Sequence, residues 1–409
     1  MGFFDRFLSR AEEAPLPGLE GLLEARGVPG DLPGLGPLLP SFEAHRKPQE
    51  REAWADAVAE LHALGLGLPE PWSDAQDHLL PELVPAWVAE RETPWSQGFI
   101  DGLSQRICIA GVPIPGAWIR LWDQPEDDVL DLALDHLRQR SEGTFERLPS
   151  GIYRGPWRDG HDAARLLLPE VWQGLFKDQH PFLAIPSADT LLASPQILLP
   201  KLMEEVGKSI QASAKPLQLA LLERIEDRLV TARLQEPHPM SSPQRELKQM
   251  DLLEALRQQE ADLEPSLGRP ATVAMLKTPQ GKPMTLAVWA EGAPVLLPET
   301  DLVGFTSAGG VSLGLYTRQT LPRINEIRGE AVAIWGPRRI RYAAFPTAEQ
   351  ISRLECFATA EQMKALLAPG GNRPAAPRPP GQPGSALGQG APPLPRHLQG
   401  AGLGVQDAE

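Results

Sequence analysis

The segment that decides the fold runs from residue 106 to residue 194. Its main stretches read RICIAGVPIPGAWIRLW (106–122), GIYRGPWRDGHDAARLLLPEVW (151–172) and HPFLAIPSADTLLAS (180–194). Short apolar runs separated by Pro-Gly and Asp-Gly turn signals favour strands. Longer stretches with apolar residues three and four positions apart favour helices. These interlocking signals predict one α+β module.

Strands and helices can be predicted within this segment. The predicted strands are 106–114, 117–122, 152–157, 182–185 and 190–193, with Pro115-Gly116 as the first turn. The predicted helices are 125–140, with acidic residues in its first turn, and 161–175. In the second helix Leu168 and Trp172 share an apolar face, so we expect both to pack against the strand at 182–185.

Composition and periodicity change outward from this module. Residues 369–409 are mostly Pro, Gly and Ala, which cannot bury enough apolar surface to fold. Strand patterns on either side of 278–281 and of Gly336-Pro337 predict two hairpins. In chain order, the predicted parts are an N-terminal amphipathic helix with a Pro/Gly linker (1–40), a helical Trp-rich segment (41–99), the α+β module (100–200), a helical connector (201–267), a β-rich domain with a closing helix (268–368) and a disordered Pro/Gly-rich tail (369–409).

Helical periodicity dominates the predicted connector. Apolar residues recur every three to four positions at 216–235 and, more sparsely, at 244–262, which predicts a helix in each stretch. Ser242-Pro243 precedes the second helix and predicts its start, with the hydroxyl as the N-cap. A last helix is predicted at 347–367.

Charge and composition limit the function classes. The 409-residue chain has a formal net charge of −14, which disfavours nonspecific binding to nucleic acid and anionic membranes. Its two cysteines favour neither a disulfide framework nor a zinc site. Without a long apolar run or a signal-peptide pattern, the expected location is cytoplasmic. Phe3, Phe4 and Phe7 lie on one face of a predicted helix and offer at most weak peripheral membrane contact.

Six features follow one another in a fixed order between residues 100 and 194. They are Arg106 at the head of a strand, the following WIRLW, the run Phe145-x-x-Leu148-Pro149, the strand IYRGPW, the run Asp159-Gly160-x-Asp162-Ala163-x-Arg165, and Pro186 with Asp189 in a turn. In this order they resemble the YtpQ-like family, a bacterial domain family of unknown function. The resemblance implies an α+β module of bacterial origin, and it implies no activity.

The first candidate site is Asp159, His161, Asp162 and Arg165. Asp162 and His161 could bind a metal, or Arg165 and the helix N-terminus could hold a phosphate. The alternative is structural: Asp159 caps the helix, Asp162 faces its dipole, and Arg165 pairs with Asp162 at the surface. We favour the structural alternative, because a metal site usually needs three or four ligands.

The second candidate site is the basic hairpin of Arg338, Arg339 and Arg341, with Trp335 and Tyr342 beside it. Strand alternation would place Arg339 and Arg341 on one face, where they could hold phosphates while the aromatic rings stack on bases. The alternative is an edge guarded by charge against aggregation, which the acidic composition favours.

Two weaker patterns are also present in the sequence. Ser312 lies in Gly-x-Ser-x-Gly, but a nucleophile elbow needs a strand before the serine and a helix after it, so a Gly-rich loop is favoured. Pro186 with Asp189 and Pro298 with Asp301 lie in similar apolar contexts, as in a duplication or a recurrent turn.

The sequence therefore predicts an uncharacterised, non-enzymatic cytoplasmic bacterial protein that binds a protein partner as an interaction or scaffold module. No cofactor or metal is expected, because no phosphate-binding loop, dinucleotide fingerprint or metal-ligand motif is present. A nucleic-acid binder that uses the Arg338–Arg341 hairpin is the first alternative. A hydrolase with an unrecognised site is the second.

Overall fold

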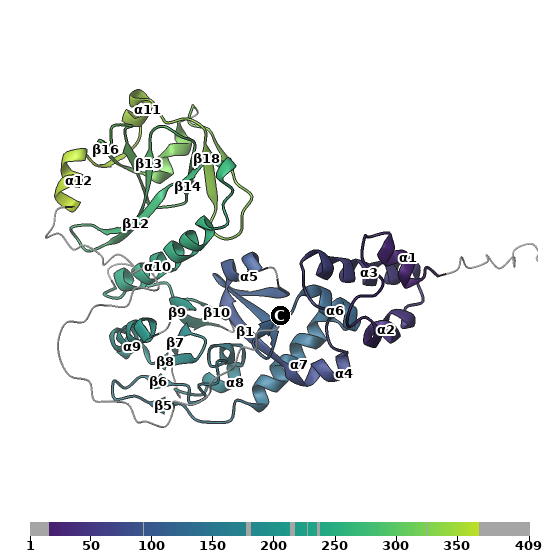
Figure 1. The fold of residues 1–409 in the computed structure, drawn as a ribbon. Helices are drawn as coiled ribbons and strands as arrows, with labels where there is room; N and C mark the ends of the chain where they lie inside the picture. The colour runs from purple at the N-terminus through teal and green to yellow at the C-terminus, as the bar shows by residue number, and fades with distance from the viewer. Residues whose placement is uncertain are drawn as a thin grey trace, which may run out of the picture. The chain divides into compact units, whose positions relative to one another are not determined.

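The computed structural model describes residues 16–92, 94–176, 181–212, 217–226, 228–234, 238–324 and 326–367. It shows the mixed α+β fold that the sequence predicts, with several separate sheets (Figure 1). The predictions for Phe3, Phe4 and Phe7 and for the tail at 369–409 lie outside the described residues. Within the described residues, no helix has both the length and the apolar character needed to cross a membrane.

The first part of the chain is a group of helices around the buried side chain of Trp54. These helices are α1 (Leu19–Glu24), η1 (Gly36–Leu38), α2 (Leu39–Ala44), α3 (Pro48–Ala63) and α6 (Gly116–Trp122). The strand predicted at 117–122 was therefore wrong, because this stretch is a helix. Ala117 and Leu121 pack toward Trp54, while Ile119 packs in a different core. A short helix that packs against two cores exposes few residues, here only Arg120, so its sequence shows no helical period and resembles a strand.

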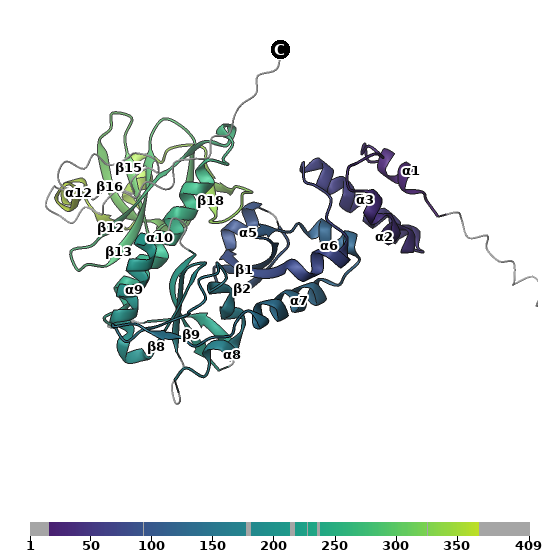
Figure 2. The same cartoon turned by 60° about the horizontal axis from the view of Figure 1, so that its bottom comes forward.

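The first sheet is antiparallel, with β3 at its centre. Its strands are β1 (Leu79–Pro85), β2 (Ser96–Ile100), β3 (Leu103–Ile109) and β4 (Val112–Pro113). The turn between β3 and β4 lies at Ala110 and Gly111, both with positive φ, and not at the predicted Pro115-Gly116. Helices near this sheet are α4 (Trp72–Ala75), η2 (Gln76–His78), α5 (Ala86–Glu92) and α7 (Glu126–Gln139). The helix predicted at 125–140 is confirmed as α7, which packs on β1 (Figures 1 and 2).

The second sheet has six strands in the order β10-β9-β7-β8-β6-β5. The strands are β5 (Glu146–Arg147), β6 (Tyr153–Arg154), β7 (Phe182–Ser187), β8 (Thr190–Ser194), β9 (Gln218–Ile225) and β10 (Arg228–Thr231). Side chains alternate between its two faces, as a pleated strand requires. Phe182 and Ala184 face the core below α9 (Leu199–Ala212), which follows η4 (Gln196–Leu198). Leu183 and Ile185 face the opposite core.

The helix predicted at 216–235 was wrong, because this stretch forms the hairpin of β9 and β10. Leu221 faces one core and Leu222 the other, and both are fully buried. A strand that is buried on both faces shows no alternation of apolar and polar residues, so its pattern cannot be told from that of a buried helix. The predicted helical connector therefore supplies two strands to the sheet of the preceding module.

The helix predicted at 161–175 is broken into η3 (Ala163–Leu167) and α8 (Pro169–Trp172). Pro169 begins α8, and its ring disfavours helical geometry at the residue before it. Trp172 is buried with Leu183 on β7, as predicted. Leu168 is buried instead with residues of β1 and α7, because the break turns it away from β7.

Helix α10 (Ser241–Glu260) confirms the helix predicted at 244–262. The predicted cap was wrong: the N-cap is Met240, two residues before Ser242, and the Ser242 hydroxyl donates to the carbonyl of Gly281 at 3.1 Å. The Gln244 side chain contacts β9 through the backbone of Leu221, and the Gln249 amide donates to the carbonyl of Pro283 on the opposite side. Helix α10 thus contacts both the six-stranded sheet and the β-rich domain (Figure 2).

The C-terminal domain consists of two sheets around Trp289 and Phe305. The strands of the first sheet are β11 (Arg269–Pro270), β14 (Val295–Pro298), β17 (Gly329–Ala331) and β18 (Arg339–Tyr342). The strands of the second are β12 (Thr272–Lys277), β13 (Pro283–Ala290), β15 (Leu302–Thr306), β16 (Ser312–Thr317) and β19 (Cys356–Ala358). Other elements are η5 (Pro265–Leu267), η6 (Arg318–Arg323), α11 (Ala348–Ser352) and α12 (Ala360–Leu367). The first predicted hairpin is confirmed as β12–β13. The second exists as β17–β18, but its first strand was misplaced: β17 ends at Ala331, and residues 332–338 connect it to β18 in place of a tight turn at Gly336-Pro337.

Two expectations for this domain fail. The single closing helix at 347–367 was wrong, because β19 separates α11 from α12 and pairs with β16. The two similar proline-containing segments also differ in structure. After Pro186 the chain turns from β7 into its own partner β8, whereas after Pro298 it passes from β14 into β15 of a different sheet. The two segments are therefore similar in sequence but not in topology.

Candidate functional site

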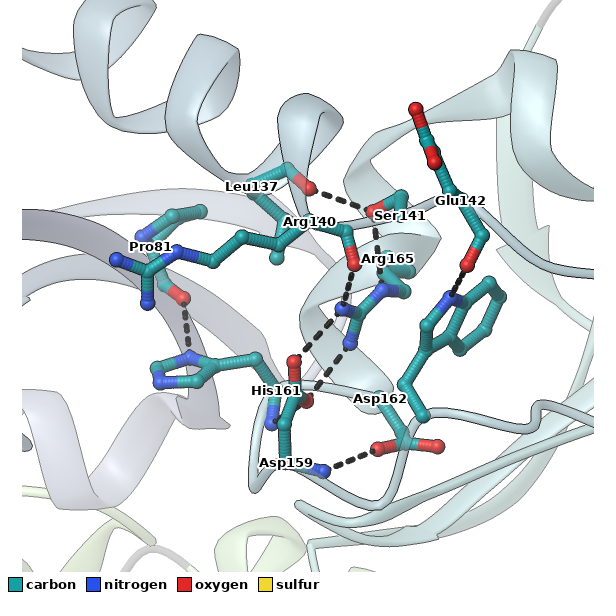
Figure 3. A network of polar contacts seen from close by, with 10 residues as sticks. Pro81, Leu137, Arg140, Ser141, Glu142, Asp159, His161, Asp162 and Arg165 are labelled. Atoms are coloured by element: carbon teal, nitrogen blue, oxygen red, sulfur yellow. Dashed lines mark hydrogen bonds and ion pairs between the residues drawn. The ribbon is translucent and has the colours of Figure 1, made fainter.

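The first predicted site contains a buried arginine rather than a surface pair. Arg165 is fully buried, and its Nη1 and Nη2 atoms donate to Asp159 Oδ1 and Oδ2 at 2.8 and 2.7 Å (Figure 3). Nη2 also donates to the carbonyl of Arg140, and Nε donates to the Ser141 hydroxyl at 2.9 Å. The guanidinium lies over the ring of Trp157, 4.3 Å from its centre. Each nitrogen of the guanidinium already has an acceptor.

The structural alternative was wrong about the partner, because Arg165 pairs with Asp159 and not with Asp162. It was also wrong about the cap, because Asp162 and not Asp159 is the N-cap of η3. Asp162 is buried, and its Oδ2 accepts from the backbone N–H of Asp159 at 3.3 Å (Figure 3). His161 is held apart, since its Nδ1 lies 3.1 Å from the carbonyl of Pro81 on β1. The four candidates thus tie a loop to β1 and to the end of α7.

The carboxyl groups of this cluster have opposite pKa shifts. Burial alone would raise the pKa of Asp159, but hydrogen bonds from Arg165 and from the backbone of His161 outweigh it and lower the pKa to about 2. Burial dominates at Asp162 and raises the pKa of its carboxyl. In the described part of the chain, no group of three or more His, Cys, Asp or Glu side chains could hold a metal ion. The arrangement stabilises a loop.

The basic hairpin is divided between the interior and the surface. Arg339 is fully buried: Nε donates to the Gln259 side chain, and Nη2 donates to the carbonyl of Leu256 at 3.0 Å. Burial lowers the pKa of Arg339, although the charge of Glu260 opposes the shift. The favoured interpretation, a charged edge, was wrong for Arg339, because β18 lies between β14 and β17 and the guanidinium is buried. The alternative phosphate contact does not fit either, because the guanidinium is fixed between β18 and α10.

The remaining members of this hairpin do not form one surface. Arg341 Nε donates to the carbonyl of Leu267 at 2.7 Å, while the exposed Arg338 lies 3.8 Å from Glu299. Trp335 stacks on Trp87 with ring centres 5.8 Å apart, so its face is already covered. Tyr342 is buried in the domain core. Alternation did place Arg339 and Arg341 on one side of the strand, opposite Ile340 and Tyr342, which face the domain core. That side is covered by α10 at Arg339, while Arg341 is half-buried beside Leu267.

Ser312 does not have the surroundings of a nucleophile elbow. It is the first residue of β16, so a strand follows it where an elbow requires a helix. Its hydroxyl donates to the sulfur of Met363 at 3.4 Å. The geometry agrees with a position at the end of the Gly-rich loop.

A surface that sequence reasoning missed lies between α9 and α10, on the face of the six-stranded sheet that both helices cover. It is a groove of about 490 Å³. Its lining residues are Pro200, Met203, Glu204, Gly207, Ile210, Gln211, Met240, Pro243, Glu246, Leu247 and Met250. Three methionines thus come together from α9, from the turn before α10 and from α10 itself. Met250 is 39 % exposed, although it lies on a helix face beside buried Leu247.

The chemistry of the groove is that of a flexible apolar surface. Methionine side chains are unbranched and polarizable, so they adapt to differently shaped apolar partners. The charged side chains among the lining residues, Glu204 and Glu246, are both acidic. Glu246 pairs with Lys277 at 2.8 Å, which leaves Glu204 as the less compensated carboxylate at this surface. An apolar groove with acidic side chains is suited to an apolar segment that also carries basic residues.

The sequence carried only a partial signal for this groove. Met250 and Leu247 lie one turn apart on a recognisable helix, but Met203 and Met240 join them only through the packing of α9 and α10. No protein-family model matches the chain, and no curated protein or solved structure matches it either. The function must therefore be inferred from the geometry.

Proposed function

We propose that the protein is a non-enzymatic interaction protein that binds a basic amphipathic helix of a protein partner in the groove between α9 and α10. The methionine-lined groove is the observation that carries this proposal. Grooves formed by two helices receive the apolar face of a third helix in several known recognition modes. The cytoplasmic, bacterial setting and the YtpQ-like kinship belong to the same proposal and rest on the sequence.

The partner chemistry follows from the groove lining. Its apolar side chains need an apolar face, and helical residues at i, i+3, i+4 and i+7 provide one. The carboxylates of Glu204 and Glu246 favour Lys or Arg at the edge of that face, because complementary charge guides association and orientation. An acidic helix would meet like charge here and would bind less well.

Site-specific photo-crosslinking tests the proposal. A photoreactive amino acid at Met250 of the full chain should crosslink, in cells, to one segment of a second protein that has a basic amphipathic pattern. The same amino acid at Leu64, which is 56 % exposed and belongs to another part of the chain, should not capture that segment. The captured segment should then be made as a peptide, and its affinity should be measured by calorimetry.

Substitutions that introduce a negative charge into the groove supply the matched variants. Met203→Glu and Met250→Glu should each weaken binding of the captured peptide at least tenfold, because each places a carboxylate against its apolar face. Leu64→Glu should leave the affinity unchanged. A crosslink from position 250 to residues 1–15 of this chain would contradict the proposal, because the chain would then occupy its own groove. An acidic captured segment would contradict it as well.

A further inference from the structure

A polar cleft lies on the other side of α10 from the groove, where the helix meets the C-terminal domain. Its volume is about 610 Å³, within the range of small-molecule sites. The residues used below are Arg245, Lys248, Gln249, Glu299, Asp301 and Arg318, all of which line the cleft. They come from α10, from the turn between β14 and β15, and from η6, so only the folded chain brings them together.

Asp301 is saturated with hydrogen bonds. Its Oδ1 accepts from Arg245 Nη2 at 2.8 Å. Its Oδ2 accepts from Gln249 Nε2 at 2.9 Å and from the backbone N–H and hydroxyl of Thr285 at 2.8 and 2.9 Å. Arg245 and Asp301 thus neutralise each other and form a fixed wall of the cleft.

Arg318 is the unusual member of the cleft. It is 7 % exposed, and its Nε is buried without a hydrogen-bond partner. Among the described residues, its guanidinium has neither a carboxylate partner nor a side-chain hydrogen bond, unlike buried Arg165 and Arg339. A buried and uncompensated cation destabilises a fold. Its presence on the wall of a cleft is explained if an anion from solution completes its contacts.

The other polar groups indicate what kind of anion fits. Lys248 is exposed and has no ion pair within the described part of the chain, so the cleft has a second uncompensated cation. The remaining carboxylate, Glu299, lies 3.8 Å from Arg338, which offsets its charge. Two free cations suit a doubly charged phosphate better than a single carboxylate. Gln249 Oε1 is buried without a partner and can accept from a hydroxyl.

We propose that this cleft binds a small phosphate monoester that carries a free hydroxyl group. Arg318 and Lys248 contact the phosphate, and Gln249 accepts the hydrogen bond from the hydroxyl. The arrangement binds without reacting, so no bond of the ligand is made or broken. This proposal stands apart from the groove between α9 and α10, because the lining residues of the two sites differ.

Calorimetry on the full chain tests the proposal with defined probes at matched ionic strength. Glycerol 3-phosphate should bind saturably. Methyl phosphate, which has the same charge but no hydroxyl, should bind roughly fivefold more weakly, because it cannot satisfy Gln249. Inorganic phosphate is the third probe, and it should also bind more weakly than glycerol 3-phosphate.

Variants distinguish a specific binding site from nonspecific attraction of anions. Arg318→Met keeps the length of the side chain and should abolish glycerol 3-phosphate binding while raising the Tm of the free protein, since it removes an unpaired buried charge. Lys248→Met is at the surface and should weaken binding about tenfold without affecting folding. Arg323→Met, an exposed position on the same η6 segment and outside the cleft, is the control and should bind as the wild type does.

Several results would overturn the proposal. One is that none of the three probes gives saturable heat at millimolar concentration. A second is that Arg318→Met or Lys248→Met binds glycerol 3-phosphate as tightly as the Arg323→Met control. A third is that methyl phosphate binds as tightly as glycerol 3-phosphate, which would remove the role of Gln249.

Discussion

Arg165 and Asp159 form a two-point ion pair in which the guanidinium is fully buried and the carboxylate remains partly exposed. Arg165→Ala should lower the free energy of unfolding by roughly 3–5 kcal/mol, because the acceptors at Asp159, Ser141 and Arg140 would lose their donor. Arg158→Ala is the matched control. Its exposed pair with Glu146, at 3.3 Å, should contribute under about 1 kcal/mol. Urea unfolding measures the free energy of unfolding of both variants. Equal losses would show that the buried ion pair stabilises the fold no more than the exposed one.

Stability should depend on pH through Asp251 on α10. Burial raises the pKa of this carboxyl to about 6, and the charge of Glu254 adds to the rise. The unfolded chain loses the proton near pH 4, so the folded state binds it more tightly and stability falls as the pH rises from about 4 to about 6. Asp251→Asn should therefore stabilise the protein by roughly 1–3 kcal/mol at about pH 8 and by little at about pH 4.

Asp131→Asn, on the exposed face of α7, is the control for this pH dependence. Its effect should stay within about 0.5 kcal/mol at both pH values. A stabilisation by Asp251→Asn that is the same at about pH 4 and about pH 8 would show that Asp251 does not titrate as expected.

Trp172 should contribute strongly to the stability of the core that packs against β7. It is 2 % exposed, packs with Leu183 and Ile185, and donates from Nε1 to the carbonyl of Leu166. Trp172→Ala should lower the free energy of unfolding by about 3–5 kcal/mol because it opens a cavity. Phe357→Ala, at an exposed position, should lower it by under about 1 kcal/mol. A loss at Trp172 no larger than the loss at Phe357 would disprove the packing.

The basic hairpin should not bind nucleic acid. In gel-shift assays at physiological salt, the protein should retard neither single- nor double-stranded DNA or RNA, because Arg339 is buried and the chain is strongly acidic. Retardation that is lost when Arg338 and Arg341 are both changed to Ala would contradict this expectation. The pair is chosen because Arg339→Ala would also disturb the fold.

The Ser312 hydroxyl should not react as a nucleophile. A fluorophosphonate probe should leave it unlabelled, because it begins a strand and donates to the sulfur of Met363. Intact-mass spectrometry measures the labelling. A mass increase in the wild type that Ser312→Ala abolishes would restore the hydrolase alternative.

Helices and strands were predicted best where one face is buried and the other is exposed to solvent. Helix α7 has Asp127, Asp131 and Asp135 exposed opposite its buried leucines, and its position was predicted closely. The hairpin β12–β13 was also predicted, because its turn residues are distinctive. By contrast, α6 and β9 are buried on two sides, and each was assigned the wrong type for that reason.

The sites were harder to predict than the elements. Charge at short spacing drew attention to Arg165 and Arg339, yet both are buried for structural reasons. The groove and the cleft depend on residues far apart in the chain, such as Met203 with Met250 and Arg245 with Arg318. A single sequence shows which side chains could act, but tertiary packing decides which of them meet.

Helix α10 has a consequence for how the chain can be divided. The side chains of Gln249, Arg245 and Gln259 all bond to the C-terminal domain, at Pro283, Asp301 and Arg339. A fragment that starts near Gly268 would leave the buried guanidinium of Arg339 without its acceptors at Gln259 and Leu256 and should express poorly. The C-terminal unit that a gene fusion or recombination event could transfer intact therefore begins near Ser241. It includes α10.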